Sequence, residues 1–269
     1  MHTTTLTLTT CQAAIGESVV AAITRYLESR LGVPVRFVND LPWQERERQF
    51  DAGHIDIAWV CGAPYVRKMS DNRAFELLAA PVYAAPRYMN KPIYFSDVIV
   101  RCDDSQYQTF SDLGGGRWAY NTAGSHSGYE VVRYHLGCLG LNGNFFNRVI
   151  CSGAHQRSME MIAQGEVDAS AVDSTVFEAV RMINPALCEA LRVIEVLGPS
   201  SQPPWVIGTH VPAALRAELR AVLTTMDTDD AGQAVLHIGQ LARFAHVSDA
   251  TYSDIREMIR AADAAGVVL

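Results

Sequence analysis

The sequence has no run of about 18 apolar residues, which a membrane-spanning helix would need. Its start also lacks the basic and then apolar pattern of a secretory leader. Instead, residues 3–9 predict a strand, because Thr and Leu alternate from residue 5 to residue 9. Either the natural protein is cytoplasmic, or the sequence begins at a trimmed mature end with an added Met1. These absences argue against a membrane span and leave the compartment open.

Paired cysteines and an excess of basic residues are also missing. The six cysteines form no C-x-x-C pair, so they are predicted to be small buried apolar residues rather than a zinc site or a disulfide framework. We expect neither a metal nor a cofactor. With 22 Lys and Arg against 29 Asp and Glu, the net charge is -7, which argues against nucleic acid as the main partner. A small anion is compatible with this charge, because local backbone amides can bind it.

What is present is an ordinary globular composition, with 49% hydrophobic and 19% charged residues in a chain of 269. The first 60 residues predict alternating strands and helices, which is typical of a parallel sheet. A helix is expected at 13–31 and is ended by Gly32, and the apolar run at 55–60 predicts a strand covered on both faces. The same alternation recurs between the long strand predicted at 93–100 and the one at 192–197.

We therefore predict an α/β fold of two Rossmann-like lobes, joined by two crossing strands and enclosing a ligand cleft. Lobe 1 is discontinuous and comprises residues 1–92 and 206–269. Lobe 2 comprises residues 93–205 and has a hinge strand at each end. The chain from residue 232 onwards is predicted to be helical and to pack on the first lobe.

The most informative stretch is 118–132, which predicts a strand end, a polar turn and a helix start. Ser125, His126, Ser127 and Gly128 lie where that helix begins. First-turn amides lack intrahelical partners and carry the positive end of the helix dipole, so this stretch could bind phosphate, phosphonate or carboxylate. The alternative is that Ser125 or Ser127 is only an N-cap.

Other candidate residues also follow predicted strands, where ligands bind in open parallel sheets. His155 and Asp173 each come just after a strand of the second lobe, Tyr94 lies on a crossing strand, and Tyr65 lies in a loop after the third strand. The structural alternatives are a loop histidine bonded to backbone for His155, a helix N-cap for Asp173 and a core aromatic for Tyr94.

Five stretches together resemble one family in their order and spacing. They are GHIDIAW at 53–59, YFSDVIV at 94–100, SHSGY at 125–129, GAH at 153–155 and GEVDASAVD at 165–173. The sequence is similar, over roughly residues 3–240, to the phosphonate/phosphite/phosphate substrate-binding proteins of ABC transporters. That resemblance implies the type 2 periplasmic-binding fold.

The resemblance also implies a set of ligand contacts. In that family a Ser-x-Ser turn at a helix start holds the phosphonate oxygens, and Ser125, His126 and Ser127 match it. A histidine after the next strand is matched by His155, and a tyrosine on the crossing strand is matched by Tyr94. Each of these residues is therefore expected to contact the ligand.

The sequence departs from the family's pattern in the first lobe and at residues 202–203. An aromatic residue of the first lobe, usually tyrosine, is replaced by Trp43, whose structural alternative is an anchor for a short helix. Members that bind aminoalkylphosphonates carry acidic groups for the ammonium. Here Asp173 matches one, but Gln202 and Pro203 stand where the second is expected. A simpler oxyanion is therefore favoured.

The leading hypothesis is a monomeric, non-catalytic solute-binding protein that closes two lobes on a small phosphorus oxyanion. It would serve an ABC transporter permease and be periplasmic if a leader has been trimmed. The alternatives are a cytoplasmic enzyme on the same fold, resembling the futalosine-pathway menaquinone enzymes and acting on a small carboxylate metabolite, and a ligand-sensing domain. In the enzyme His126, His155 or Asp173 would be the acid or base. No nucleophile-base-orienter series is visible, which favours binding.

Overall fold

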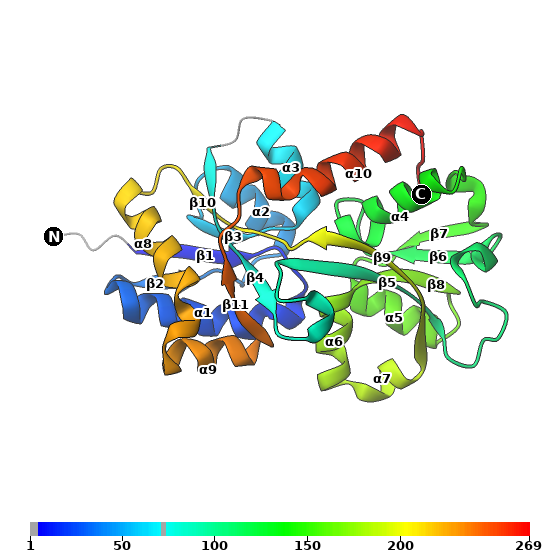
Figure 1. The fold of residues 1–269 in the computed structure, drawn as a ribbon, viewed down its shortest axis with the longest axis horizontal. Coiled ribbons are helices and arrows are strands. Elements are labelled where there is room, and N and C mark those ends of the chain that lie inside the picture. Colours follow the sequence, from blue (N-terminus) through cyan, green and yellow to red (C-terminus); the bar gives the residue numbers. More distant parts are fainter. Residues whose placement is uncertain (1–4, 71–73) are drawn as a thin grey trace. The chain divides into compact units, whose positions relative to one another are not determined.

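A computed structural model describes residues 5–70 and 74–269, with strands and helices alternating along most of the chain (Figure 1). The strands are β1 (Leu6–Thr10), β2 (Val35–Phe37), β3 (Ile57–Trp59), β4 (Phe75–Tyr83), β5 (Ile93–Arg101), β6 (Arg117–Tyr120), β7 (Arg148–Cys151), β8 (Ala169–Asp173), β9 (Leu191–Ser201), β10 (Trp205–Gly208) and β11 (Leu241–Ala245). The α-helices are α1 (Glu17–Leu31), α2 (Trp43–Asp51), α3 (Gly62–Ser70), α4 (Val131–Cys138), α5 (His155–Ala163), α6 (Ser174–Ile183), α7 (Pro185–Glu189), α8 (Ala213–Thr224), α9 (Asp230–Ile238) and α10 (Ser253–Ala264).

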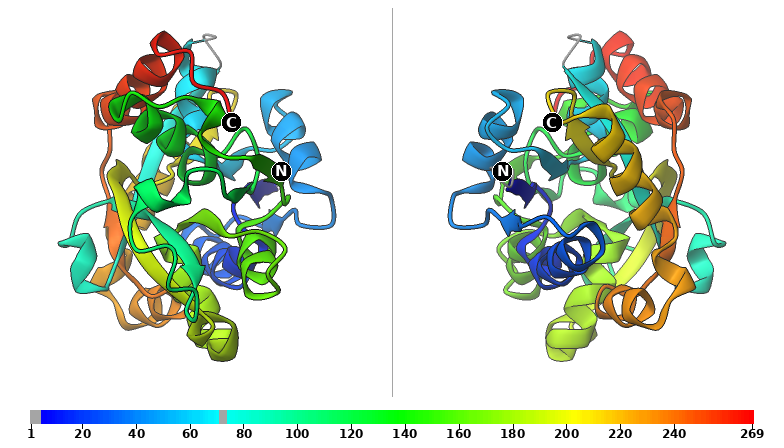
Figure 2. Two further views of the ribbon diagram at one scale, coloured as in Figure 1. Left: turned by 90° about the vertical axis from the view of Figure 1, so that its right-hand side faces the viewer. Right: turned by 90° about the vertical axis from the view of Figure 1, so that its left-hand side faces the viewer.

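The chain divides into two compact units. Unit 1 is formed by the chain up to Ile93 and by Ser201–Tyr252, and unit 2 by Tyr94–Ser200 and Ser253–Leu269. The sequence analysis assigned residues 253–269 to the first lobe, whereas the structure places them in unit 2. The physical reason is that α10 packs on α4, beside which it lies in Figures 1 and 2. Helical periodicity predicts that a helix forms, but it does not identify the surface that the helix covers.

The sheet of unit 1 has the order β11-β4-β10-β3-β1-β2. Strand β1 pairs in parallel with β2 and β3, which confirms the parallel arrangement predicted for the first 60 residues. Gly32 ends α1 in a left-handed conformation (φ 65°), as expected. The prediction that the chain is helical from residue 232 onwards is wrong at β11, which pairs antiparallel with β4 because its Leu241 and Phe244 belong to the core.

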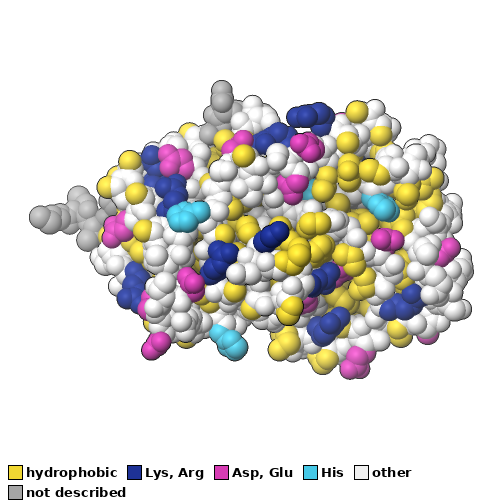
Figure 3. Space-filling view, viewed as in Figure 1, with side chains coloured by type: hydrophobic (Ala, Val, Ile, Leu, Met, Phe, Trp, Pro, Cys, Tyr) yellow, Lys and Arg dark blue, Asp and Glu magenta, His cyan; other side chains and the backbone are white. Residues whose placement is uncertain are grey.

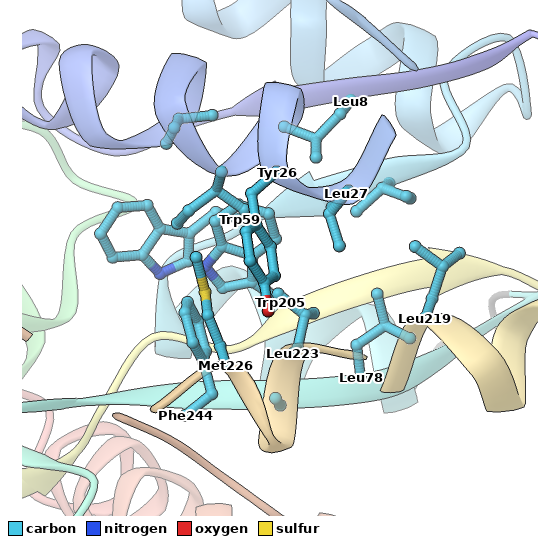
Figure 4. Close-up of a cluster of buried hydrophobic side chains, with 14 of the residues drawn as sticks. Leu8, Tyr26, Leu27, Trp59, Leu78, Trp205, Leu219, Leu223, Met226 and Phe244 are labelled. Carbon is cyan, nitrogen blue, oxygen red and sulfur yellow. The ribbon is translucent and has the colours of Figure 1, made fainter. Parts of the chain in front are cut away.

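The core of unit 1 is built around two stacked indoles. Trp59 on β3 and Trp205 on β10 lie with ring centroids 5.9 Å apart, and Figure 4 shows aliphatic side chains gathered around them. These include Leu27 from α1 and Leu223 from α8, both fully buried. Helices from distant parts of the sequence therefore share this core.

The sheet of unit 2 has the order β7-β6-β8-β5-β9. Strand β6 is parallel to both β7 and β8, while β5 is antiparallel to β8 and places Ser96 opposite Asp173. In the core of unit 2, the fully buried Trp118 of β6 stacks on Phe146, with ring centroids 4.6 Å apart. The carboxyl ends of β6, β7 and β8 and the beginning of β5 consequently share one edge of the sheet.

Charged side chains of both signs are interspersed on the face drawn in Figure 3. Within residues 5–70 and 74–269, no helix is long and apolar enough to cross a membrane.

Candidate anion-binding site

The site begins at the turn between β6 and α4, which we call the Ser-His-Ser-Gly turn (residues 125–128). The chain enters a π-helical turn, η4 (His126–Glu130), directly before α4, and such turns are frequent at functional sites. The Ser125 hydroxyl accepts a hydrogen bond from the Gly128 amide at 3.1 Å. Ser125 is therefore an N-cap, as the structural alternative predicted, and Ser127 occupies the first helical turn, where amides lack intrahelical acceptors.

Ser127 and His155 are brought together from two neighbouring strands. Ser127 Oγ lies 3.0 Å from His155 Nε2 and 3.4 Å from Ser125 Oγ. Both residues are almost fully buried, with 3% and 6% of their surface exposed. The His155 Nδ1 atom is buried and has no hydrogen-bond partner among the described residues. Since a buried imidazole nitrogen without a partner is costly, a hydrogen-bonding ligand here would be stabilising.

Gly128 allows this close approach because it has no side chain. A Cβ atom at this position would overlap Asn121 Oδ1 and would lie 3.0 Å from Asn121 Cγ and 3.2 Å from His155 Cε1. By contrast, a Cβ atom at Gly124, in the same loop, would meet nothing within 4 Å. A side chain at position 128 would therefore displace Asn121 and the His155 ring, whereas one at position 124 would not.

His126 is fully buried, and its ring faces the two strands at which the chain passes between the units. Its Nε2 lies 2.9 Å from Ser200 Oγ, and its ring centroid lies 6.4 Å from that of Tyr94, which is also fully buried. Sequence reasoning did not identify Ser200, because 74 residues separate it from His126 and no local pattern indicates the contact. The ligand contacts expected of His126 and Tyr94 stay predictions.

Asp173 ends β8 at the edge of the sheet where β6 and β7 also end, and it caps α6. Its Oδ1 accepts hydrogen bonds from the Thr175 amide at 2.8 Å and from the Thr175 hydroxyl at 2.7 Å. Burial raises the pKa of Asp173 to about 6, the hydrogen bonds from Thr175 lower it, and the charge of Asp97 adds to the rise. Asp97 is fully buried on β5 and was not identified from the sequence. The N-cap alternative is therefore confirmed, while a ligand contact by Asp173 stays a prediction.

His155 is neutral at pH 7. Burial lowers the pKa of its imidazole from 6.5 to about 4. An anion bound beside the ring would favour the protonated form and raise this pKa. The ring's charge is therefore a direct reporter of an anion at this site.

The two remaining candidates belong to unit 1. Trp43 is half-buried and opens α2. Tyr65, on α3, is fully buried, its hydroxyl lies 3.1 Å from Asp249 Oδ1, and its ring centroid lies 4.6 Å from that of Tyr252. These contacts serve the packing of unit 1, and ligand contacts by Trp43 and Tyr65 stay predictions. Across the described part of the chain, no group of three or more His, Cys, Asp or Glu side chains is placed to hold a metal ion.

Comparison with known families identifies the chain. Residues 11–252 match the family described as ABC transporter, phosphonate, periplasmic substrate-binding protein. The chain belongs to this family. The match confirms the resemblance found in the sequence, and members of this phosphonate-binding family are periplasmic solute-binding proteins. No curated protein matches the sequence.

Solved structures establish the fold of this phosphonate-binding family member. A binding protein component of an ABC phosphonate transporter from Pseudomonas aeruginosa is 17% identical, with a TM-score of 0.85 over 97% of this chain and 87% of that chain. PhnD1 from Prochlorococcus marinus, in complex with methylphosphonate, is 18% identical, with a TM-score of 0.83 over 95% and 97%. The aliphatic sulphonate binding protein SsuA from Escherichia coli is 16% identical, with a TM-score of 0.64 over 95% and 85%. The predicted type 2 periplasmic-binding fold is confirmed.

Proposed function

We propose that this protein binds a small phosphorus oxyanion (phosphonate, phosphite or phosphate) at the Ser-His-Ser-Gly turn and delivers it unchanged to an ABC transporter permease. The observation that carries the proposal is the buried contact of 3.0 Å between Ser127 and His155 at a helix start. Because the family is periplasmic, we place the mature protein in the periplasm. We also expect it to act as a monomer.

The chemistry of the site suits such an anion. A phosphorus oxyanion presents several acceptor oxygens, and the turn offers hydroxyl hydrogens, first-turn amides and an imidazole nitrogen. The methylphosphonate bound by PhnD1 supports this ligand class. Since Asp173 already accepts two hydrogen bonds from Thr175, a simple oxyanion remains favoured over an aminoalkylphosphonate.

Binding without turnover is favoured by the environment of His155. The Ser127–His155 pair resembles a nucleophile and its base, but a catalytic histidine is usually oriented through its other ring nitrogen. In the described residues His155 Nδ1 has no such partner, and a pKa of about 4 makes the ring a weak base at neutral pH. We therefore expect the ligand to leave the protein chemically unchanged.

Calorimetric titration would test this function directly. The purified protein is titrated with phosphate, phosphite, methylphosphonate and 2-aminoethylphosphonate, and each mixture is then analysed by ³¹P NMR. We expect at least one of the first three to bind tightly and to be recovered intact. Conversion of a ligand would favour the enzyme alternative, and no binding by any of the four would contradict the proposed ligand class.

Replacing Ser127 by alanine is expected to weaken oxyanion binding by about 1–3 kcal/mol, roughly 5- to 150-fold, through loss of a charge-assisted hydrogen bond. Ser111→Ala is the matched control, because Ser111 is an exposed serine of the same unit. Calorimetry on both variants would check this. An affinity of Ser127→Ala equal to that of the control would exclude a ligand contact by the Ser127 hydroxyl.

A further inference from the structure

Asn121 lies directly after β6, and its backbone is joined to the loop that carries His155. Its carbonyl oxygen accepts a hydrogen bond of 2.9 Å from the Gly153 amide, and the carbonyl oxygen of Tyr120 accepts one of 2.8 Å from the Ser152 amide. These bonds extend the parallel pairing of β6 with β7 beyond the ends of both strands. Asn121 is therefore held in a fixed position beside the loop that leads to His155.

The side chain of Asn121 lies against Gly128, beside the His155 ring. A Cβ atom added to Gly128 would overlap Asn121 Oδ1 and would lie 3.0 Å from Asn121 Cγ and 3.2 Å from His155 Cε1. The carboxamide and this edge of the imidazole therefore border the same point. Because Cε1 is bonded to both ring nitrogens, contacts at this edge help to set the direction in which Nε2 faces the Ser127 hydroxyl.

Hydrogen bonding of the side-chain oxygen does not explain why Asn121 takes this place. Its Oδ1 atom is buried and has no hydrogen-bond partner among the described residues. A buried acceptor of this kind lowers stability, because it has lost its hydrogen bonds to water. The oxygen therefore contributes through the space that it fills, and protein interiors are packed closely enough for that space to matter.

We propose that Asn121 is a positioning residue for anion binding, a spacer that holds the His155 ring against Ser127. The inference rests on the proposed function, because it concerns the same site, and Asn121 acts through His155 without touching the ligand. A spacer can be replaced by another group that fills the same space. Two substitutions that each weaken binding are therefore expected to compensate for each other.

The test is a double-mutant cycle, with affinities for inorganic phosphate and methylphosphonate measured by calorimetry. Asn121→Ala opens space beside the His155 ring and is expected to weaken binding about 10-fold. Gly128→Ala places a methyl group where Asn121 Oδ1 lies, and alone it is expected to weaken binding about 10-fold as well. In the double variant the added methyl group fills the space that the carboxamide leaves. Its affinity is expected to lie within about 3-fold of the starting protein, whereas independent effects would multiply to about 100-fold.

Two comparisons separate positioning from a merely structural role. Asn121→Leu keeps the branched shape without polar atoms, so its affinity is expected to lie within about 3-fold of the starting protein. Asn144→Ala removes an exposed asparagine of the same unit and is the matched control, with unchanged affinity. Without ligand, ¹⁵N NMR is expected to show shifted His155 ring resonances in Asn121→Ala and nearly the original ones in Asn121→Leu and in the double variant.

Three results would overturn the inference: a loss of about 100-fold in the double variant, unshifted His155 resonances in Asn121→Ala, or binding by Asn121→Leu as weak as that by Asn121→Ala. The last would show that the carboxamide acts through a polar contact. If Asn121→Ala does not fold, Asn121→Ser, which also shortens the side chain, takes its place. If the unaltered protein binds neither anion, the proposed function fails, and the ring resonances measured without ligand still decide whether Asn121 positions His155.

Discussion

Replacing Gly128 by alanine is expected to lower the affinity for a phosphorus oxyanion about 10-fold, because the new methyl group displaces side chains at the proposed anion site. The added Cβ would overlap the Asn121 side chain and press on the His155 ring, 3.2 Å away. Moving the ring would strain its contact with Ser127, and the two side chains proposed to hold the anion would then lose part of their alignment. Calorimetric titration with phosphate and methylphosphonate would measure the loss.

Gly124→Ala is the matched control for this experiment. It adds the same methyl group to the same loop, but nothing lies within 4 Å of the new atom, so the affinity is expected to remain unchanged. Circular dichroism of both variants would establish that each is folded. Equal affinities of the two variants would contradict the close packing described for the turn.

The second large effect concerns the pH dependence of stability, in which His155 and Asp173 are expected to oppose each other. His155 has a folded-state pKa of about 4, below its ordinary 6.5, so its contribution to the free energy of unfolding is present above pH 6.5 and lost as the pH falls through 4. Asp173 has a raised pKa of about 6, so its contribution is present below pH 3.8 and lost as the pH rises through 6. Each contribution amounts to about 3 kcal/mol.

Single substitutions are expected to expose these opposed slopes. With His155→Gln, the contribution of Asp173 is unopposed, so the free energy of unfolding should fall as the pH rises from about 4 to 6. With Asp173→Asn, which keeps a good N-cap, it should rise over the same interval. Urea unfolding in phosphate-free buffers would measure both. The same pH slope in the two variants would contradict the buried environments assigned to these groups.

The local elements of this fold could be predicted from the sequence, because each has a signal in neighbouring residues. The helix ended by Gly32 and the turn from β6 into η4 depend on periodicity and on residues that break or cap a helix. The candidate site was also found locally, since Ser127 follows β6 and His155 follows β7, which are parallel neighbours. Because β6 and β7 are neighbours in the sheet, the two residues that follow these strands lie close together.

The sequence could not show which element each helix or strand packs against or pairs with. Strand β11 follows α9 closely and is recognised only through its pairing with β4. Helix α10 has an ordinary amphipathic pattern, and its assignment to unit 2 depends on the contacts of Arg133 with Asp263 and Val267, at least 130 residues away. The His126–Ser200 contact likewise joins residues that are far apart in the sequence, so no local pattern indicates it. Periodicity indicates that one face of a helix or strand is buried. Tertiary structure decides which other element that face packs against.

The measurement that tests the central claim most directly is ¹⁵N NMR of the His155 imidazole during a pH titration, with and without saturating oxyanion. The oxyanion used is the one that binds most tightly by calorimetry, and His155→Gln provides the assignment. We predict that without ligand the ring protonates with a midpoint of about 4, and that the bound anion shifts the ring resonances and raises this midpoint. A ligand that binds at saturation yet leaves the resonances and midpoint of His155 unchanged would show that the anion binds elsewhere.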